Sequence, residues 1–198
     1  MTARRAGTLG WLGVVAALSA LPAHGEGPLP REILYTLTSI DTVPTKQDLQ
    51  TVLASPDNEL TLLRQYSLGT SFDFGMRLRA IRAMPHFCTG QMTECRSALL
   101  AALDDPAGTP GQQILRKRAA IEALGAARSG DPGDVPLLVG YLAHESRDLR
   151  VAAVRALRDL CDPAAIGPLQ QRRLLPTEVA QVKQAIDEAL GVIAQCGP

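Results

Sequence analysis

The chain has 198 residues, of which 46% are hydrophobic and only 4% aromatic, and its 20 Lys and Arg residues balance 20 Asp and Glu residues. This balance argues against nucleic-acid binding, because proteins that bind nucleic acids usually carry an excess of basic residues. The length suits a single domain, and with so few aromatic side chains its core must be built largely from Leu, Ala, Val and Ile.

The first 25 residues have the pattern of an export signal. Arg4 and Arg5 give a positive start, residues 11–21 form an apolar stretch, and Ala23 begins a small-residue cleavage site. The apolar stretch is too short to span a membrane, which takes about 20 residues. We therefore expect a signal peptide at residues 1–25 that is removed from the mature protein.

The signal predicts that the protein is exported, to the periplasm or outside the cell. After its removal the mature chain is expected to begin at Glu26. Cleavage after Ala23 is the alternative. Loss of Arg4 and Arg5 leaves 18 basic against 20 acidic residues, a net charge of −2. No later stretch is long and apolar enough to suggest a transmembrane span in the mature protein.

Residues 26–56 are expected to form a leader and a degenerate capping repeat. Residues 26–30 are rich in Gly and Pro, which indicates a flexible segment. Residues 33–40 combine β-forming residues with apolar positions at helical spacing, so helix and strand both stay open, with helix preferred. Residues 45–53 predict a short helix capped by Thr45. An end repeat of this kind covers the core on one side and faces water on the other.

One nine-residue stretch, Leu-Arg-Val-Ala-Ala-Val-Arg-Ala-Leu at 149–157, has three near-copies in the chain. They lie at 76–84, 116–124 and 182–190, so their starts are 40, 33 and 33 residues apart. Self-similarity at such a period is typical of helical solenoids. The apolar residues of the stretch follow three- and four-residue steps and form one stripe on a helix. Its alanines would allow a neighbouring helix to approach closely.

Four helix pairs are predicted over residues 57–198, each joined by a turn. They comprise 57–68 with 72–87, 93–103 with 112–127, 134–141 with 149–161, and 163–173 with 177–195. The Pro- and Gly-rich stretch 104–111 explains the longer first interval as an insertion. Thr177 is expected to cap the last helix.

The repeated residues resemble the HEAT family, in particular the short bacterial HEAT-like repeats of the phycobilin-lyase type. The shared pattern is an apolar first helix, a turn, the stretch at 149–157, and a second turn with Asp-Pro-Ala-Ala-Ile at 162–166. The resemblance covers roughly residues 57–195. It implies an all-α, right-handed α-solenoid of about four helix pairs, and it implies binding of protein partners more often than catalysis. It does not choose the partner, because fold does not fix function.

The four cysteines, Cys88, Cys95, Cys161 and Cys196, form an even set in a chain expected to be exported, which favours disulfide bonds. Three pairings are possible and stay open. Cys88 with Cys95 would close a small loop, while Cys161 and Cys196 should lie at the same end of adjacent helices because the repeat period is 33. The alternative is a metal site at His86, Cys88 and Cys95, whose spacing fits no common zinc pattern.

A row of basic residues recurs at one position of the repeat: Arg77, Lys117, Arg150 and Lys183. As an exposed ladder along the stack, the row could attract an acidic protein segment or an anionic glycan. The alternative, which we favour, is that these residues pair with acids of neighbouring turns. Asp148, Asp159 and Glu178 lie within plausible reach.

No motif for catalysis accompanies the repeats. Deoxyhypusine hydroxylase, an iron enzyme built of similar repeats, holds its metal with His-Glu pairs at the start of its second helices, and the equivalent positions here carry no ligand residue. We therefore expect no catalytic, metal-binding or cofactor-binding residues. The hypothesis is a monomeric, exported adaptor or scaffold for an unidentified protein partner. The alternatives are an exported enzyme subunit and a ligand- or glycan-binding protein that uses the concave face of the solenoid.

Overall fold

The computed structural model describes residues 36–37, 44–53 and 59–196. Over these residues the chain is all helical, with nine α-helices, two short 3-10 helices and no strand. The predicted signal at 1–25 and most of 33–40 lie outside the described residues, although Thr36 and Leu37 are helical. None of the helices in the described part is both long and apolar enough to cross a membrane.

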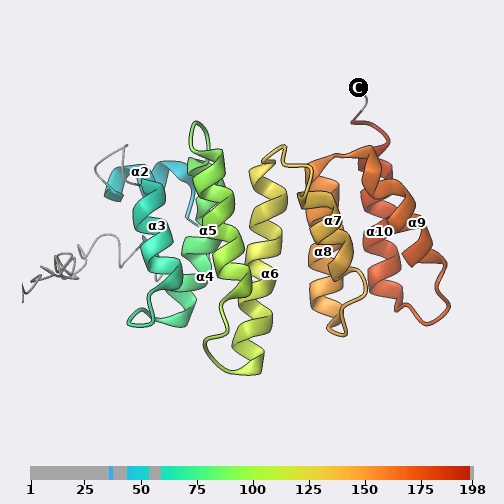
Figure 1. Cartoon of the computed structure of the whole chain (residues 1–198), viewed down its shortest axis with the longest axis horizontal. Helices are drawn as coiled ribbons and strands as arrows, with labels where there is room; N and C mark the ends of the chain where they lie inside the picture. The colour runs from blue at the N-terminus through green and yellow to red at the C-terminus, as the bar shows by residue number, and fades with distance from the viewer. Residues whose placement is uncertain (1–35, 38–43, 54–58, 197–198) are drawn as a thin grey trace, which may run out of the picture.

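The helices form a short leading element and four pairs, which follow one another along the long axis of the molecule (Figure 1). The pairs are α3 (Glu59–Leu68) with α4 (Phe74–Ala83), α5 (Met92–Asp104) with α6 (Pro110–Ala127), α7 (Asp134–Tyr141) with α8 (Arg147–Leu160), and α9 (Ile166–Leu174) with α10 (Ala180–Ile193). The leading helix is α2 (Lys46–Leu53), η1 (Met84–Phe87) extends α4, and η2 (Pro163–Ala165) precedes α9. The expected all-α solenoid of helix pairs is confirmed.

Two helix starts show how local hydrogen bonds set these bounds. The Thr45 side chain accepts the backbone N–H of Asp48 at 3.2 Å, and the Asp48 carboxylate accepts the backbone N–H of Thr45 at 2.9 Å. This reciprocal pair confirms Thr45 as the cap of α2. Thr109 and Gln112 form the same kind of capping box at the start of α6, which therefore begins two residues before the predicted position.

The start of the last helix differs from the prediction. Thr177 is not its cap, because α10 begins at Ala180 with Val179 in the capping position. The Glu178 carboxylate accepts the backbone N–H of Val179 at 2.9 Å and so satisfies a donor that the helix leaves free. Glu178 is itself fixed by long-range contacts, which a local capping rule does not include.

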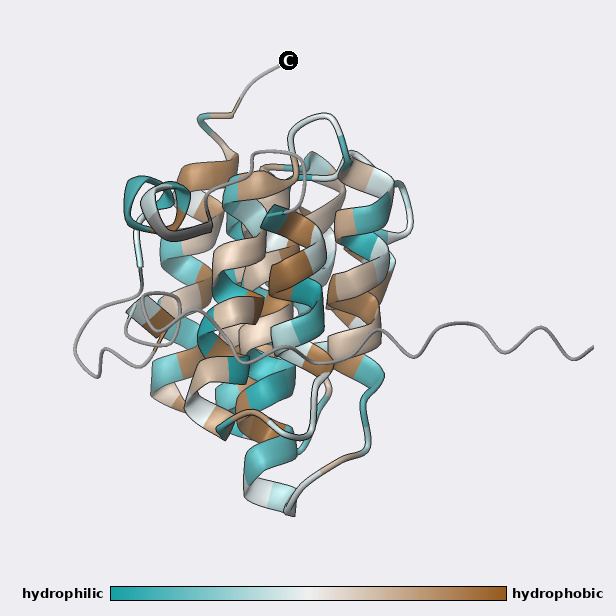
Figure 2. Cartoon of the chain, turned by 90° about the vertical axis from the view of Figure 1, so that its left-hand side faces the viewer, coloured by the Kyte–Doolittle hydropathy of each residue, from teal (hydrophilic) through white to brown (hydrophobic). Residues whose placement is uncertain are grey.

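The second helices of the pairs form a continuous layer. Helix α4 packs on α6, α6 on α8 and α8 on α10, while each also packs on the first helix of its own pair. The first helices α5, α7 and α9 contact one another far less. We infer that the stack curves toward the second helices, which therefore line its inner face. Viewed from the N-terminal side, the helices carry both hydrophobic and hydrophilic stretches, as an amphipathic stack requires (Figure 2).

A close approach in this layer joins Gly125 of α6 to Ala156 of α8. A Cβ added at Gly125 would lie 2.5 Å from the Cα and 2.8 Å from the carbonyl oxygen of Ala156. Both residues are buried. The small residues of the repeat therefore do permit close helix packing, although Gly125 itself lies outside the repeated nine-residue stretch.

Substitution of this glycine tests the packing. Because the added methyl group would meet backbone atoms, Gly125→Ala should lower the free energy of unfolding by about 2 kcal/mol, as overpacked cores do. Gly191→Ala is the matched control, since it lies in α10 with no atom within 4 Å of an added Cβ. That variant should be more stable by about 0.5 kcal/mol, because Ala favours a helix over Gly. Urea unfolding measures both, and a Gly125→Ala variant as stable as the wild type would contradict the packing described.

Candidate binding surface

The four residues of the predicted basic ladder do not form an exposed row. Arg77 is 7% exposed and Arg150 is 9% exposed, whereas Lys117 and Lys183 are partly exposed. Neither lysine forms an ion pair with another residue in the described part of the chain. Two of the four positions are therefore unavailable to a partner, and the possible exposed ladder, which was the less favoured interpretation, is wrong at Arg77 and Arg150.

Arg150 connects two repeats from the inside. Its Nη1 donates to the carbonyl oxygens of His144 at 2.9 Å and Glu145 at 2.8 Å, which belong to the loop of its own helix pair. Its Nη2 lies 2.9 Å from Oε1 of Glu178, in the loop of the following pair. Glu178 also binds Arg172. The favoured alternative, pairing within the chain, is thus what the structure has at Arg150.

The same contact occurs at the first junction of the stack. Nη2 of Arg77 lies 2.7 Å from Oδ2 of Asp105, in the loop between α5 and α6. Nε of Arg77 donates to the carbonyl oxygen of Ser67 at 3.1 Å, in its own pair. In both junctions the arginine and the carboxylate are 28 residues apart. A second-helix arginine that binds the loop carboxylate of the next pair is therefore a recurring feature, which we call the junction clamp.

In α6 the buried arginine is Arg116 and not Lys117. Arg116 is 0% exposed, donates to the carbonyl oxygens of Asp105 and Ala107, and places Nη1 3.3 Å from Oδ2 of Asp105. Burial lowers the pKa of Arg116, and the charge of Asp105 opposes this shift. The repeat pattern does not single out Arg116, because Arg116 aligns with Leu149, an apolar core position. The inserted loop at 104–111 supplies the carbonyl groups that make an arginine possible there.

Glu178 is a buried carboxylate that remains ionised. Burial alone would raise the pKa of Glu178, but hydrogen bonds from Arg150, from the backbone of Val179 and from Arg172 outweigh burial and lower the pKa below its ordinary value. The negative charge is thus stabilised by the two arginines that it holds. The junction between the last two repeats depends on this charge.

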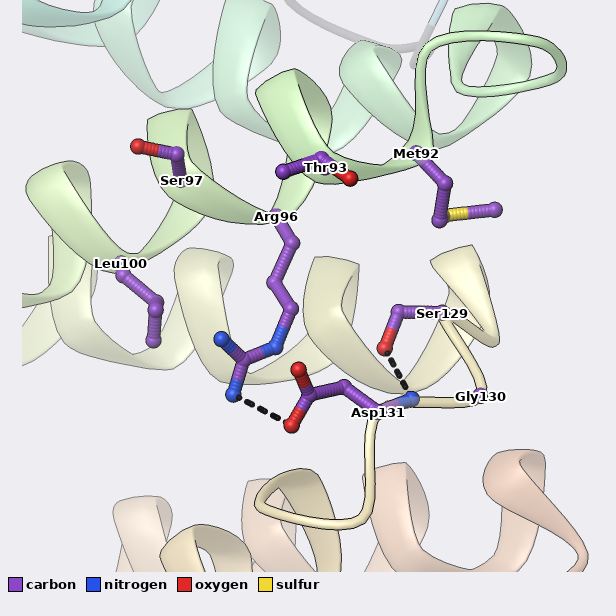
Figure 3. Close-up of a pocket in the computed structure, with 8 residues that line it drawn as sticks. All are labelled: Met92, Thr93, Arg96, Ser97, Leu100, Ser129, Gly130 and Asp131. Carbon is purple, nitrogen blue, oxygen red and sulfur yellow. Dashed lines mark hydrogen bonds and ion pairs between the residues drawn. The ribbon is translucent and has the colours of Figure 1, made fainter.

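A cavity of about 390 Å³ lies between α5 and the loop that follows α6 (Figure 3). Arg96 extends from α5 toward the loop, where its Nη2 lies 3.2 Å from Asp131 and its Nε lies 2.7 Å from the buried carboxylate of Asp134. The Ser129 hydroxyl accepts the backbone N–H of Asp131 at 3.0 Å. These polar groups bond to one another, so they hold the loop against α5.

The four predicted cysteines lie in two pairs. The Cα atoms of Cys88 and Cys95 are 5.4 Å apart and those of Cys161 and Cys196 are 5.8 Å apart, both within the range of a disulfide. Of the three pairings left open by the sequence, this is the one that the structure has. Among the described residues, no three His, Cys, Asp or Glu side chains gather in an arrangement that could hold a metal ion.

The inner face carries both charged and apolar residues that are accessible to solvent. The buried arginines of the junction clamps are not among them. Arg82 of α4 and Arg118 of α6 both bind Glu122, at 3.5 Å and 2.8 Å. Leu115, one turn before Arg118, is 45% exposed. Arg155 of α8 is exposed and has no partner within residues 59–196. We define the inner face by these residues and their neighbours on α4, α6, α8 and α10.

The comparison with known families agrees with the repeat geometry. A family model of HEAT repeats matches residues 112–191, which span α6 to α10. Residues 112–191 are HEAT repeats. The expected resemblance is confirmed over these residues, and the α3 and α4 pair, which lies outside them, continues the same stack of helix pairs. HEAT repeats generally serve as scaffolds for protein interactions. No curated protein matches the chain.

Glu178→Gln tests the junction clamp between the last two HEAT repeats. The variant should lose about 3 kcal/mol of unfolding free energy near neutral pH, because two arginines lose their buried counter-charge. Since the folded-state pKa of Glu178 is lowered, its stabilisation is present above the ordinary pKa of 4.5 and is lost as the pH falls through the folded-state value. The difference between wild type and variant should therefore shrink in acid.

Urea unfolding over a series of pH values measures this difference. Glu188→Gln is the matched control, because Glu188 is exposed on α10 and its carboxylate accepts a hydrogen bond from Gln184 at 3.0 Å and from no other described residue. The control should differ little from wild type at any pH. A Glu178→Gln deficit that is the same at neutral and acidic pH would show that the charge of Glu178 is not what stabilises the junction.

Proposed function

We propose that this HEAT-repeat protein is an exported, non-catalytic scaffold that binds a protein partner on the inner face of its stack. One observation carries the proposal. The repeats bond their buried arginines and carboxylates to each other and present, along the second helices, a surface that carries both exposed arginines and exposed apolar side chains. We further propose that the chain acts as a monomer.

The composition of the inner face supports a protein partner. Leu115 is 45% exposed on α6 and Val192 is 43% exposed on α10, and both are second-helix residues. Arginines beside exposed apolar side chains are typical of protein interfaces, where Arg is enriched. The cavity at Arg96 does not favour the ligand-binding alternative, because its charged groups already bond each other.

Export is supported by the sequence and by the cysteines. The first 25 residues have the charged start, apolar stretch and cleavage site of a signal peptide. The two cysteine pairs at disulfide distance suit an oxidising compartment, because cytosolic thiols are kept reduced. The periplasm and the extracellular medium both meet this requirement.

Mass spectrometry of the protein from its native source tests export. The chain should begin at Glu26, and the unreduced protein should show no reactive thiol. Cleavage at Glu94 should leave Cys88 joined to Cys95, and tryptic peptides with Cys161 and Cys196 should separate only after reduction. Residues 26–198 produced in a reducing cytosol serve as the control and should have four free thiols. A native chain that retains residues 2–25 and four reactive thiols would overturn the export proposal.

Site-specific photo-crosslinking tests the scaffold function. Benzoylphenylalanine replaces Leu115 on the inner face or, as the matched control, Gln170, which is exposed on the first helix α9. Each variant is captured from an extract of the native envelope and medium after illumination. We expect a discrete protein adduct from position 115 and none from position 170. The absence of an adduct at 115, or equal adducts at both positions, would contradict a partner on the inner face.

A further inference from the structure

The first three second helices carry a local excess of positive charge. Their exposed and half-exposed ionised side chains comprise seven cations, Arg79, Arg82, Lys117, Arg118, Arg147, Arg155 and Arg158, against three carboxylates, Glu122, Asp148 and Asp159. The fourth second helix, α10, has one cation and two carboxylates, Lys183, Asp187 and Glu188. Because the whole chain is balanced, positive charge is concentrated on α4, α6 and α8.

The carboxylates on these helices do not neutralise the arginines one for one. Glu122 is shared between Arg82 and Arg118, at 3.5 Å and 2.8 Å. The hydrogen bond to Glu122 raises the pKa of Arg118, so Arg118 remains fully charged. Asp148 and Asp159 pair with Arg147 and Arg158, the residues next to them in sequence. One carboxylate for two arginines leaves a net positive charge at the junction of α4 and α6.

Arg155 is the cation with most freedom to bind a partner. It is exposed, and within the described ranges it has neither a hydrogen bond nor an ion pair. It lies seven residues after Asp148, or about two helical turns, and therefore on the same side of α8. Helix α8 packs on α6, and the charge of Asp148 contributes to raising the pKa of Arg118 on α6, as expected of groups on neighbouring helices.

An exposed leucine within this surface favours a polypeptide over a glycan. Leu115 is three residues before Arg118 and seven before Glu122, so all three lie along one stripe of α6. Leu115 is 45% exposed. A polypeptide can offer carboxylates and an apolar side chain together, whereas an anionic glycan would leave the leucine uncovered.

We propose that the surface formed by α4, α6 and α8 binds an acidic segment of the partner protein, with carboxylates on Arg82, Arg118 and Arg155 and an apolar side chain on Leu115. The proposal rests on the scaffold function and names the chemistry of its partner. The segment crosses three successive repeats and ends before α10, which offers a single cation, Lys183. Charge complementarity across such a surface speeds association and selects against basic partners.

Fluorescence anisotropy with a defined probe tests this chemistry. The probe is a fluorescein-labelled peptide of about ten residues, chiefly Glu with a central Leu, and its control has Gln at every Glu position. Residues 26–198 should bind the acidic peptide at least tenfold more tightly than the Gln peptide. The preference should weaken as salt is added, because exposed charges are screened.

Charge reversal locates the site. Arg155→Glu should weaken binding of the acidic peptide about tenfold, and it should not affect folding, since Arg155 is exposed and makes no hydrogen bond or ion pair in the described part of the chain. Arg64→Glu is the matched control, because the Arg64 side chain is exposed on α3, in the outer layer, and is also without an ion pair among the described residues. It should bind within about twofold of wild type. Circular dichroism verifies that both variants fold.

Three results would overturn the proposal. The acidic peptide could bind no better than the Gln peptide, Arg64→Glu could weaken binding as much as Arg155→Glu, or a sulfated oligosaccharide could bind more tightly than the peptide and depend on Arg155. If the Arg155→Glu variant with benzoylphenylalanine at position 115 captures the partner as well as the protein with Arg155 does, the scaffold function stands. The proposal of an acidic segment is then wrong. If the peptide binds as expected but no partner is captured, the scaffold function is wrong and the surface chemistry stands.

Discussion

A buried arginine that binds a carboxylate in the loop of the next repeat is the contact on which the arrangement of this stack depends. It occurs at both ends of the described repeats, as Arg77 with Asp105 and as Arg150 with Glu178, at the same separation of 28 residues. Apolar burial supplies most of the stabilising free energy, but it is not directional. A buried ion is costly unless its partner is in place, so at the first and the last junction the clamp disfavours a shift of one repeat against the next.

The clamp also determines which residues face solvent. The side chains of Arg77, Arg116 and Arg150 are directed inward, to backbone carbonyls and carboxylates. The arginines of the repeated stretch therefore do not form a row on the surface. The cations that a partner can meet are those one or two positions away, such as Arg118, and those a turn further along the helix, such as Arg155. The structural and the binding functions of arginine in this protein are thus assigned to different positions of the same helices.

Local patterns were enough to predict the architecture but not the chemistry of the surface. The helix pairs follow from apolar periodicity, and the Thr45 cap follows from a hydrogen bond within one turn, so both could be read from the sequence. The start of α10 was wrong because Glu178 takes part in contacts from another repeat. Burial of Arg116 was not predicted, because the inserted loop at 104–111 supplies its hydrogen-bond partners. The close packing of Gly125 was not predicted, because its neighbour Ala156 lies on another helix. Each of these depends on residues brought together only by the folded chain.

A double-mutant cycle at the first junction tests the central claim most directly. The free energy of unfolding is measured for the wild type, Arg77→Met, Asp105→Asn and the double variant. If the two side chains form a clamp across the repeats, the double variant should be more stable than the sum of the single losses predicts, with a coupling of about 2 kcal/mol. Losses that simply add would show that Arg77 and Asp105 contribute independently, and this pair would then not position the first repeat against the second.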